Sequence, residues 1–288
     1  MRSLECIPCL LGQALNMVRS TGADNEATRK VLSRALSEVG SIMDGDTAPE
    51  ICTRIYEELV AATGIKDPFV EFKKASTEAA LRLLPRMREL VEKAEDPFEK
   101  ALEISLAGNV IDLAIMTPED LPEIVNLLEK FEGEGFAIDD SAELWSEIAC
   151  AETVLFIGDN AGEAVFDRLL LESLDNPRVY FAVRGGPALN DVTYEDGVAS
   201  GISKPVEIVS TGYPAPGVIL EKSSESFRKL FQKADLVLAK GQGNYETLLN
   251  PPRPVFHLFK VKCNAVAENV GCEEGSYVVW KNKGIKGR

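Results

Sequence analysis

The chain has 288 residues, of which 45% are hydrophobic and 27% charged, and its formal net charge is −15. These values are typical of a globular protein with a sizeable core, and no apolar run approaches the roughly 20 residues of a membrane span. The negative charge argues against nucleic acid as a partner, because clustered Lys and Arg bind a phosphate backbone. We therefore expect a cytoplasmic protein that binds neither membrane nor nucleic acid. The sequence leaves the oligomeric state open.

Six cysteines and a single histidine restrict the metal and redox chemistry of the chain. Because His257 is the only histidine, a zinc site built on several histidines is excluded. Cys6 and Cys9 form the one closely spaced cysteine pair. They open a helical region instead of following a strand, which favours a structural role or an accessory metal site over a catalytic dithiol. Their role stays open at this point.

Residues 1–150 have the pattern of a helical region. Apolar residues recur at helical spacing within 11–18 and again within 27–39. Thr47 and Glu50 form a capping box in front of a third helix, and Gly64 is placed to end it.

Three further helix starts combine a polar residue with a following proline, at Asp67, Asp96 and Thr117. Pro85 lies inside a helical pattern and is expected to kink or split that helix. Ser141 is expected to cap the last helix of this region. The first half of the chain is therefore predicted to be all-helical.

From residue 153 onward, short β-branched runs alternate with helical stretches. The predicted strands are 153–157, 179–183, 206–209, 236–239, 255–260 and 277–280. This alternation predicts a mostly parallel sheet with helices on its faces, which is an α/β fold. We expect two domains, a helical region at 1–150 and an α/β catalytic domain at 151–288.

Polar or glycine-bearing segments follow five of the predicted strands. Asp159 and Asn160 follow the first strand, Asp191 lies in the loop after the second, the segment 242–244 follows the fourth, and Lys260 ends the fifth. In an open α/β sheet, ligands bind at the carboxyl ends of the strands. These segments are therefore expected to converge on one edge of the sheet.

The residue types at this edge are suited to a hard metal and a phosphate group. Carboxylate and amide oxygens such as those of Asp159, Asn160 and Asp191 are ligands that Mg²⁺ and Mn²⁺ prefer. Glycines allow backbone N–H groups to approach phosphate, and Lys260 can neutralise a phosphoryl oxygen. The chain has no P-loop motif. It also lacks the second Asp of aspartyl-phosphate phosphatases two residues after Asp159, so a metal-activated water is the favoured nucleophile.

Each segment also has a purely structural interpretation. Asp159 and Asn160 after a strand can simply cap a helix, the glycine-rich segment 185–191 can form a plain turn, and Lys260 can be a solvated charge. His257, in an alternating strand, is better explained as a core or surface residue than as a catalytic one. The catalytic interpretation depends on the convergence of all the segments, not on any one of them.

At these residues the chain resembles the damage-control phosphatase family over essentially its whole length. The resemblance is carried by the segments 159–162, 186–193, 259–260 and 107–112. The pair Cys6 and Cys9 and the Gly-Asn-Tyr-Glu run at 243–246 look like marks of its archaeal-type subfamily. The resemblance implies a helical N-terminal region and a three-layer Rossmann-like domain with a mostly parallel sheet.

The resemblance also implies a site and an activity. It places a divalent metal, Mn²⁺, Ni²⁺, Co²⁺ or Mg²⁺, on Asp159, Asn160 and Asp191, and gives Lys260 a contact with the phosphate. It implies that a small-molecule phosphate ester is hydrolysed, such as a damaged nucleotide, a cofactor precursor or a sugar phosphate. The implied substrate-binding residues are Glu163, Gln242, Gly243, Asn244, Asn109 and Asp112.

Three departures from the family pattern bear on the substrate. Relatives that act on sugar phosphates resemble this chain but carry an acidic residue in place of Gln242 and an Arg in place of Glu246, which argues against a fructose-phosphate-like substrate. Glu163 lies one residue closer to the metal motif than the matching glutamate of those relatives.

Two other functions remain as alternatives. The first is an S-adenosylmethionine-dependent carboxyl methyltransferase, although Gly158, Asp159 and Asn160 fit the glycine-rich first turn of such enzymes poorly. The second is a non-enzymatic module that binds a metal or a nucleotide without turnover.

Overall fold

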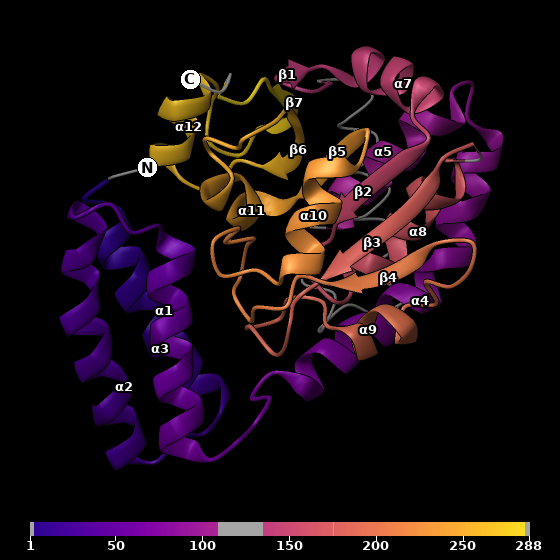
Figure 1. Cartoon of the computed structure of the whole chain (residues 1–288). Coiled ribbons are helices and arrows are strands. Elements are labelled where there is room, and N and C mark those ends of the chain that lie inside the picture. The colour runs from indigo at the N-terminus through magenta and orange to yellow at the C-terminus, as the bar shows by residue number, and fades with distance from the viewer. Residues whose placement is uncertain (1–2, 109–134, 175, 286–288) are drawn as a thin grey trace.

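The computed structural model describes residues 3–108, 135–174 and 176–285. Its N-terminal part is a bundle of three helices and one 3₁₀ turn that share a separate apolar core (Figure 1). These elements are α1 Cys6–Ser20, α2 Asn25–Glu38, η1 Val39–Met43 and α3 Ala48–Thr63.

The predicted capping box of the third helix is confirmed. The Thr47 backbone N–H donates to Glu50 Oε2 at 2.8 Å, and the Thr47 hydroxyl accepts from the Glu50 N–H at 3.4 Å. Gly64 ends α3 in the left-handed region with φ +72°, which glycine adopts at little cost.

Two long helices lead from the bundle to the sheet, α4 Val70–Lys93 and α5 Pro97–Gly108. Asp96 accepts a hydrogen bond from the Glu99 N–H at 3.0 Å, as an N-cap should. Pro85 was expected to kink or split its helix, and the split does not occur, because α4 continues through Pro85. A proline costs a helix about 3 kcal/mol, and burial of the neighbouring Leu83, Leu84 and Met87 offsets that cost.

Two predicted helix starts are displaced in the structure. Asp67 accepts from the Phe69 N–H at 3.0 Å, and α4 begins only at Val70. Ser141 is the first residue of its helix and not its cap, because the preceding Asp140 occupies the cap position. The start predicted at Thr117 lies outside the described residues.

The sheet has seven strands in the order β1-β7-β6-β5-β2-β3-β4. The strands are β1 Ile138–Asp139, β2 Thr153–Ile157, β3 Arg178–Val183, β4 Glu207–Ser210, β5 Leu236–Lys240, β6 Val255–Lys260 and β7 Tyr277–Asn282. All neighbouring pairs are parallel except β6 and β7. The predicted mostly parallel sheet is therefore confirmed, whereas β1 is a short strand inside the region predicted to be all-helical.

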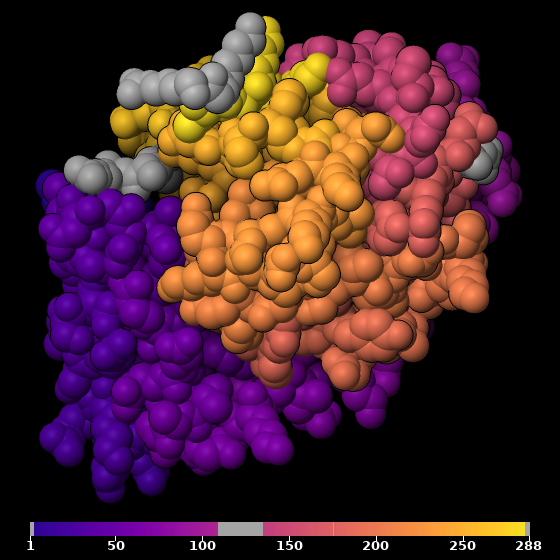
Figure 2. All heavy atoms as spheres, in the orientation of Figure 1, coloured from indigo at the N-terminus to yellow at the C-terminus, as the bar shows by residue number. Residues whose placement is uncertain are grey.

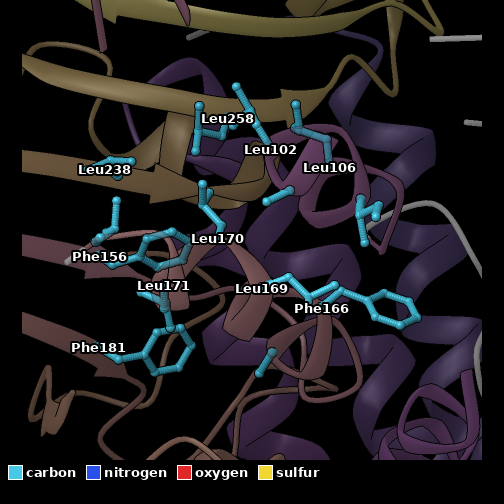
Figure 3. Close-up of a cluster of buried hydrophobic side chains, with 14 of the residues drawn as sticks. Leu102, Leu106, Phe156, Phe166, Leu169, Leu170, Leu171, Phe181, Leu238 and Leu258 are labelled. Carbon is cyan, nitrogen blue, oxygen red and sulfur yellow. The ribbon is translucent and has the colours of Figure 1, made fainter. Parts of the chain in front are cut away.

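Helices cover both faces of the sheet and give the predicted three layers. One face packs on α4, α5, α7 Ser141–Cys150 and α8 Glu163–Glu172. Figure 3 shows this core, in which Leu102 and Leu106 of α5 lie near strand residues such as Leu258. The other face packs on α10 Glu225–Lys233, α11 Gly241–Thr247 and α12 Asn264–Val270, while α9 Tyr194–Ala199 contacts α4 and β4.

The helical bundle and the sheet domain meet along a seam that Figure 2 shows on the surface. A domain boundary near residue 150 stays a prediction. The helices α4, α5 and α7, which precede residue 151, share one core with the sheet. Among the described helices, none combines the length and the apolar character that crossing a membrane requires. His257 lies in β6 and is fully buried, as expected of a core residue.

Candidate active site

The loops after β2 and β3 are joined by backbone hydrogen bonds. Asn160 and Asp191 form an isolated antiparallel bridge, the Ala161 N–H donates to the Asn190 carbonyl at 3.0 Å, and the Val192 N–H donates to the Asp159 carbonyl at 2.8 Å. Two segments about 30 residues apart in the chain are thereby held together at the carboxyl ends of parallel strands. Asp159, Asn160 and Asp191, the three predicted metal ligands, converge there.

A buried arginine lies beside the two carboxylates. Arg184 Nε donates to Asp191 Oδ2 at 2.6 Å, and Arg184 Nη2 lies 3.6 Å from Asp159 Oδ1. Burial raises the pKa of Asp191 to about 7, and the opposing charge of Arg184 limits the rise. Arg184 thus holds one oxygen of Asp191 in place and offsets part of the negative charge.

The N-terminus of α11 lies directly against Asp159. Gly241 has φ +78°, and a Cβ atom at this position would lie 2.0 Å from Asp159 Oδ2. Only glycine leaves room for the carboxylate here. Asn244, one turn further along α11, is fully buried and bonds Arg184 Nη1, the Val218 N–H and two backbone carbonyls.

A buried network of charged groups surrounds Lys240 at the end of β5. Lys240 Nζ forms an ion pair with Glu163 and donates to Asp167 Oδ1 at 2.7 Å and to the Ser105 hydroxyl at 2.8 Å. Glu163 Oε2 in turn accepts from Asn160 Nδ2 at 3.3 Å. Burial raises the pKa of Glu163 to about 7, against the opposing effect of the Lys240 charge. The network connects α5, α8 and β5 to a predicted metal ligand.

Asp159, Asn160, Glu163 and Asp191 form the floor of a cavity of about 480 Å³ between the helical bundle and the sheet. This volume lies within the range of small-molecule sites. Among the predicted site residues, the cavity is lined by Asp159, Asn160, Glu163, Asp191, Gln242, Gly243, Cys6 and Cys9.

The remaining predicted site residues are placed differently. Asn244 lies beneath the cavity, where it holds Arg184 and the backbone. Lys260 ends β6, and its Nζ lies 5.3 Å from the ring centroid of Tyr277. In the described part of the chain, the cavity is lined by Lys262, two residues after Lys260. The roles predicted for Asn244 and Lys260 stay predictions. Asn109 and Asp112 lie outside the described residues.

Sequence reasoning gave no role to four charged residues that shape the site. Arg184 and Lys240 lie at strand ends, in segments whose sequence interpretation was based on their other polar residues and their glycines. Asp167 follows Glu163 by one helical turn, a spacing that places both on one face of α8. Lys73 lines the cavity from α4, and its partner Asp196 is distant in the chain, so no local pattern could have found this pair.

The donor set at the floor fits a hard divalent cation. Asp159, Asn160 and Asp191 offer two carboxylates and an amide oxygen. Among the described residues, the four buried carboxyl groups of the site, on Asp159, Glu163, Asp167 and Asp191, lie beside two buried cations, Arg184 and Lys240, which gives these six groups a formal excess of negative charge. A bound cation would relieve this excess.

Comparison with known proteins identifies the family of the chain. Residues 3–278 match the family model of the damage-control phosphatase ARMT1-like domain. The chain therefore belongs to this family, which supports a phosphatase role for it.

Two archaeal relatives and one solved structure align with the chain over almost their whole length. The damage-control phosphatase PH1575 of Pyrococcus horikoshii is 37% identical, with 97% of each chain covered. A damage-control phosphatase of Archaeoglobus fulgidus is 29% identical, with 95% of this chain and 96% of the relative covered. The crystal structure of a DUF89 family protein from Pyrococcus horikoshii superposes with a TM-score of 0.84 at 35% identity, covering 98% of this chain and 99% of the other.

Proposed function

We propose that this protein is a metal-dependent phosphomonoester hydrolase that acts on small phosphometabolites. Asp159, Asn160 and Asp191 would hold the divalent cation, which can be Mn²⁺, Ni²⁺, Co²⁺ or Mg²⁺. The observation that carries the proposal is the bridge between Asn160 and Asp191, because it gathers three oxygen-donor side chains at the floor of a metabolite-sized cavity. Two relatives are named damage-control phosphatases, and this supports the same reaction class.

The residues of the chain have distinct roles in this proposal. Arg184 orients Asp191 by donating from Nε to Oδ2 at 2.6 Å. Glu163, held by Lys240, orients the Asn160 amide through the 3.3 Å contact with Nδ2. When bound, the cation would supply charge neutralisation for the phosphoryl oxygens and lower the pKa of the attacking water.

Phosphate release from p-nitrophenyl phosphate by chelator-stripped protein tests this function, with each cation added back in turn. We expect activity to return with at least one of the four cations and to be lost in Asp191→Asn. Asp44→Asn is the matched control, because Asp44 is exposed and does not line the cavity. Metal-dependent activity that persists at full rate in Asp191→Asn would contradict the assignment.

The same protein separates the two alternatives. A methyltransferase would bind S-adenosylmethionine in calorimetry and show no phosphate release with any cation. A binding module would bind Mn²⁺ without turnover. The family membership and the acidic cavity floor favour hydrolysis over both.

A further inference from the structure

A buried lysine joins α4 to α9 at the cavity. Lys73 lies in the first turn of α4, is buried and lines the cavity. Its Nζ lies 2.6 Å from Asp196 Oδ2 on α9 and 2.8 Å from Asp67 Oδ2. Figure 1 shows α9 beside α4. Lys73 therefore ties α9 both to α4 and to the segment that connects α4 with the helical bundle.

The carboxylate that binds Lys73 also holds the start of α9. Asp196 Oδ2 accepts from the Thr193 N–H at 3.0 Å and from the Thr193 hydroxyl at 2.7 Å. The Thr193 side chain in turn accepts from the Asp196 N–H, which completes a capping box. A single oxygen atom of Asp196 thus binds Lys73 and both donor groups of Thr193.

Thr193 lies two residues after Asp191, a proposed metal ligand. The residue between them, Val192, is fully buried. Its N–H donates to the Asp159 carbonyl at 2.8 Å, and its carbonyl accepts from the Arg184 N–H at 2.9 Å. A displacement of Thr193 would therefore be passed to Val192 and disturb the backbone of both Asp159 and Asp191.

The other end of α9 lies against the second loop of the metal site. Ser200 is fully buried, and its Oγ lies 3.2 Å from the Ala161 carbonyl oxygen. Ala161 directly follows the proposed ligand Asn160. Because α9 contacts both loops that carry proposed ligands, its position on α4 bears on the whole metal site.

Lys73 keeps two carboxylates together. Asp67 and Asp196 each have an oxygen within 2.8 Å of the same nitrogen atom. Carboxylates this close repel each other once the cation between them is removed. The repulsion would draw Asp196 away from Thr193 and loosen the start of α9.

We propose that Lys73 is a positioning residue of the metal site, acting through Asp196 and Thr193 on the loop that carries Asp191. The proposal rests on the metal-dependent function proposed above. Groups that hold metal ligands in place typically contribute about 10- to 100-fold to metal affinity or activity. Because Lys73 acts through several residues, we expect an effect at the lower end of this range.

A first experiment measures Mn²⁺ binding by calorimetry with full-length, chelator-stripped protein. We expect Lys73→Met to raise the Kd for Mn²⁺ about tenfold, and Lys73→Arg to recover most of the loss because a guanidinium also binds carboxylates. Removal of a positive charge from the cavity would by itself strengthen binding of a cation, so the direction of the change separates positioning from simple electrostatics. Unchanged or stronger Mn²⁺ binding by folded Lys73→Met would overturn the proposal.

The matched control is Lys281→Met. Lys281 also pairs with two carboxylates, those of Glu143 and Glu147 on α7, and it is not among the described residues that line the cavity. Like Lys73→Met, it should lower stability in urea unfolding, but it should keep the Mn²⁺ affinity of the unmodified protein. Equal losses of affinity in the two variants would show a general effect of stability and would count against a positioning role.

A second set of variants tests the route through Asp196. Asp196→Asn should also weaken Mn²⁺ binding, and it carries the test if Lys73→Met does not fold. The double variant Lys73→Met/Asp196→Asn should bind Mn²⁺ no more weakly than the weaker of the two single variants, because both changes break the same connection. Additive losses would mean that Lys73 acts by another route and would refute the one proposed.

Hydrogen exchange of the metal-free protein tests the positioning without metal or turnover. The Val192 and Thr193 amides are both hydrogen-bonded in the loop. By NMR, we expect these two amides to exchange about tenfold faster in Lys73→Met and at the original rate in Lys281→Met. If the unmodified protein neither binds Mn²⁺ nor releases phosphate, the proposed function fails, and exchange alone decides whether Lys73 positions the loop. Unchanged exchange at both amides in Lys73→Met would overturn the proposal.

Discussion

Gly241 provides the sharpest test of the site, because its missing side chain makes room for a proposed metal ligand. In Gly241→Ala the added Cβ would lie 2.0 Å from Asp159 Oδ2, whereas real Cβ contacts essentially never fall under 3.0 Å. The carboxylate must therefore move by about 1 Å or more. A misplacement of about 1 Å in a catalytic group can cost roughly 100-fold in rate. We expect a loss of phosphatase activity of that order and weaker Mn²⁺ binding.

Backbone strain must be separated from this displacement. A non-glycine residue in the left-handed region costs about 1–2 kcal/mol, so Gly241→Ala should also lower the free energy of unfolding. Gly64→Ala is the matched control, because Gly64 has φ +72° and a Cβ there would meet nothing within 4 Å. It should lose similar stability and keep full activity.

The assay combines phosphate release, Mn²⁺ calorimetry and urea unfolding for both variants. Full activity and unchanged Mn²⁺ affinity in folded Gly241→Ala would refute the placement of Asp159 against α11. Equal losses of activity in both variants would show that strain, and not displacement of the carboxylate, is responsible.

Two further predictions concern buried charge. Burial lowers the pKa of His257 to about 3, so below about pH 6.5 the unfolded chain takes up a proton that the folded chain does not, and stability should fall by about 2 kcal/mol by pH 5. In urea titrations at neutral pH and at pH 5, His257→Phe should lack this loss of about 2 kcal/mol. A loss of stability in the variant equal to that of the unmodified protein would contradict the prediction. Lys240→Met leaves Glu163 and Asp167 buried without their cation and should cost about 3–5 kcal/mol in urea unfolding. Lys229→Met removes an exposed lysine and should change stability by less than about 1 kcal/mol; equal effects would refute the distinction.

The strands and their order along the chain were predictable because their signals are local. β-branched runs bounded by glycine and polar residues predicted β2 and β6 with their observed bounds, and most others within one or two residues. The capping box at Thr47 and Glu50 was equally readable, because both partners lie within one helical turn. Helix boundaries at proline were less reliable, since burial in α4 outweighs the local effect of Pro85.

Part of the candidate site was likewise predictable from the sequence. The convergence of Asp159, Asn160 and Asp191 was predictable because parallel strands place their carboxyl ends at one edge. Glu163, Gln242 and Gly243 on the cavity were expected from the resemblance to the family. These predictions depend on residues close to a strand end, where sequence position and spatial position coincide.

The sequence by itself therefore determined the layers of the fold, the edge of the sheet that carries the chemistry and the oxygen donors suited to a metal. Only the tertiary structure decided which charges are paired. The partners of Lys240 lie up to 135 residues away in the chain, and Lys73 reaches Asp196 across 123 residues. Such contacts follow from the packing of α4, α5 and α8 on the sheet and leave no periodic signal. The cavity, too, exists only because the bundle is folded against the sheet domain, where α3 contacts α11.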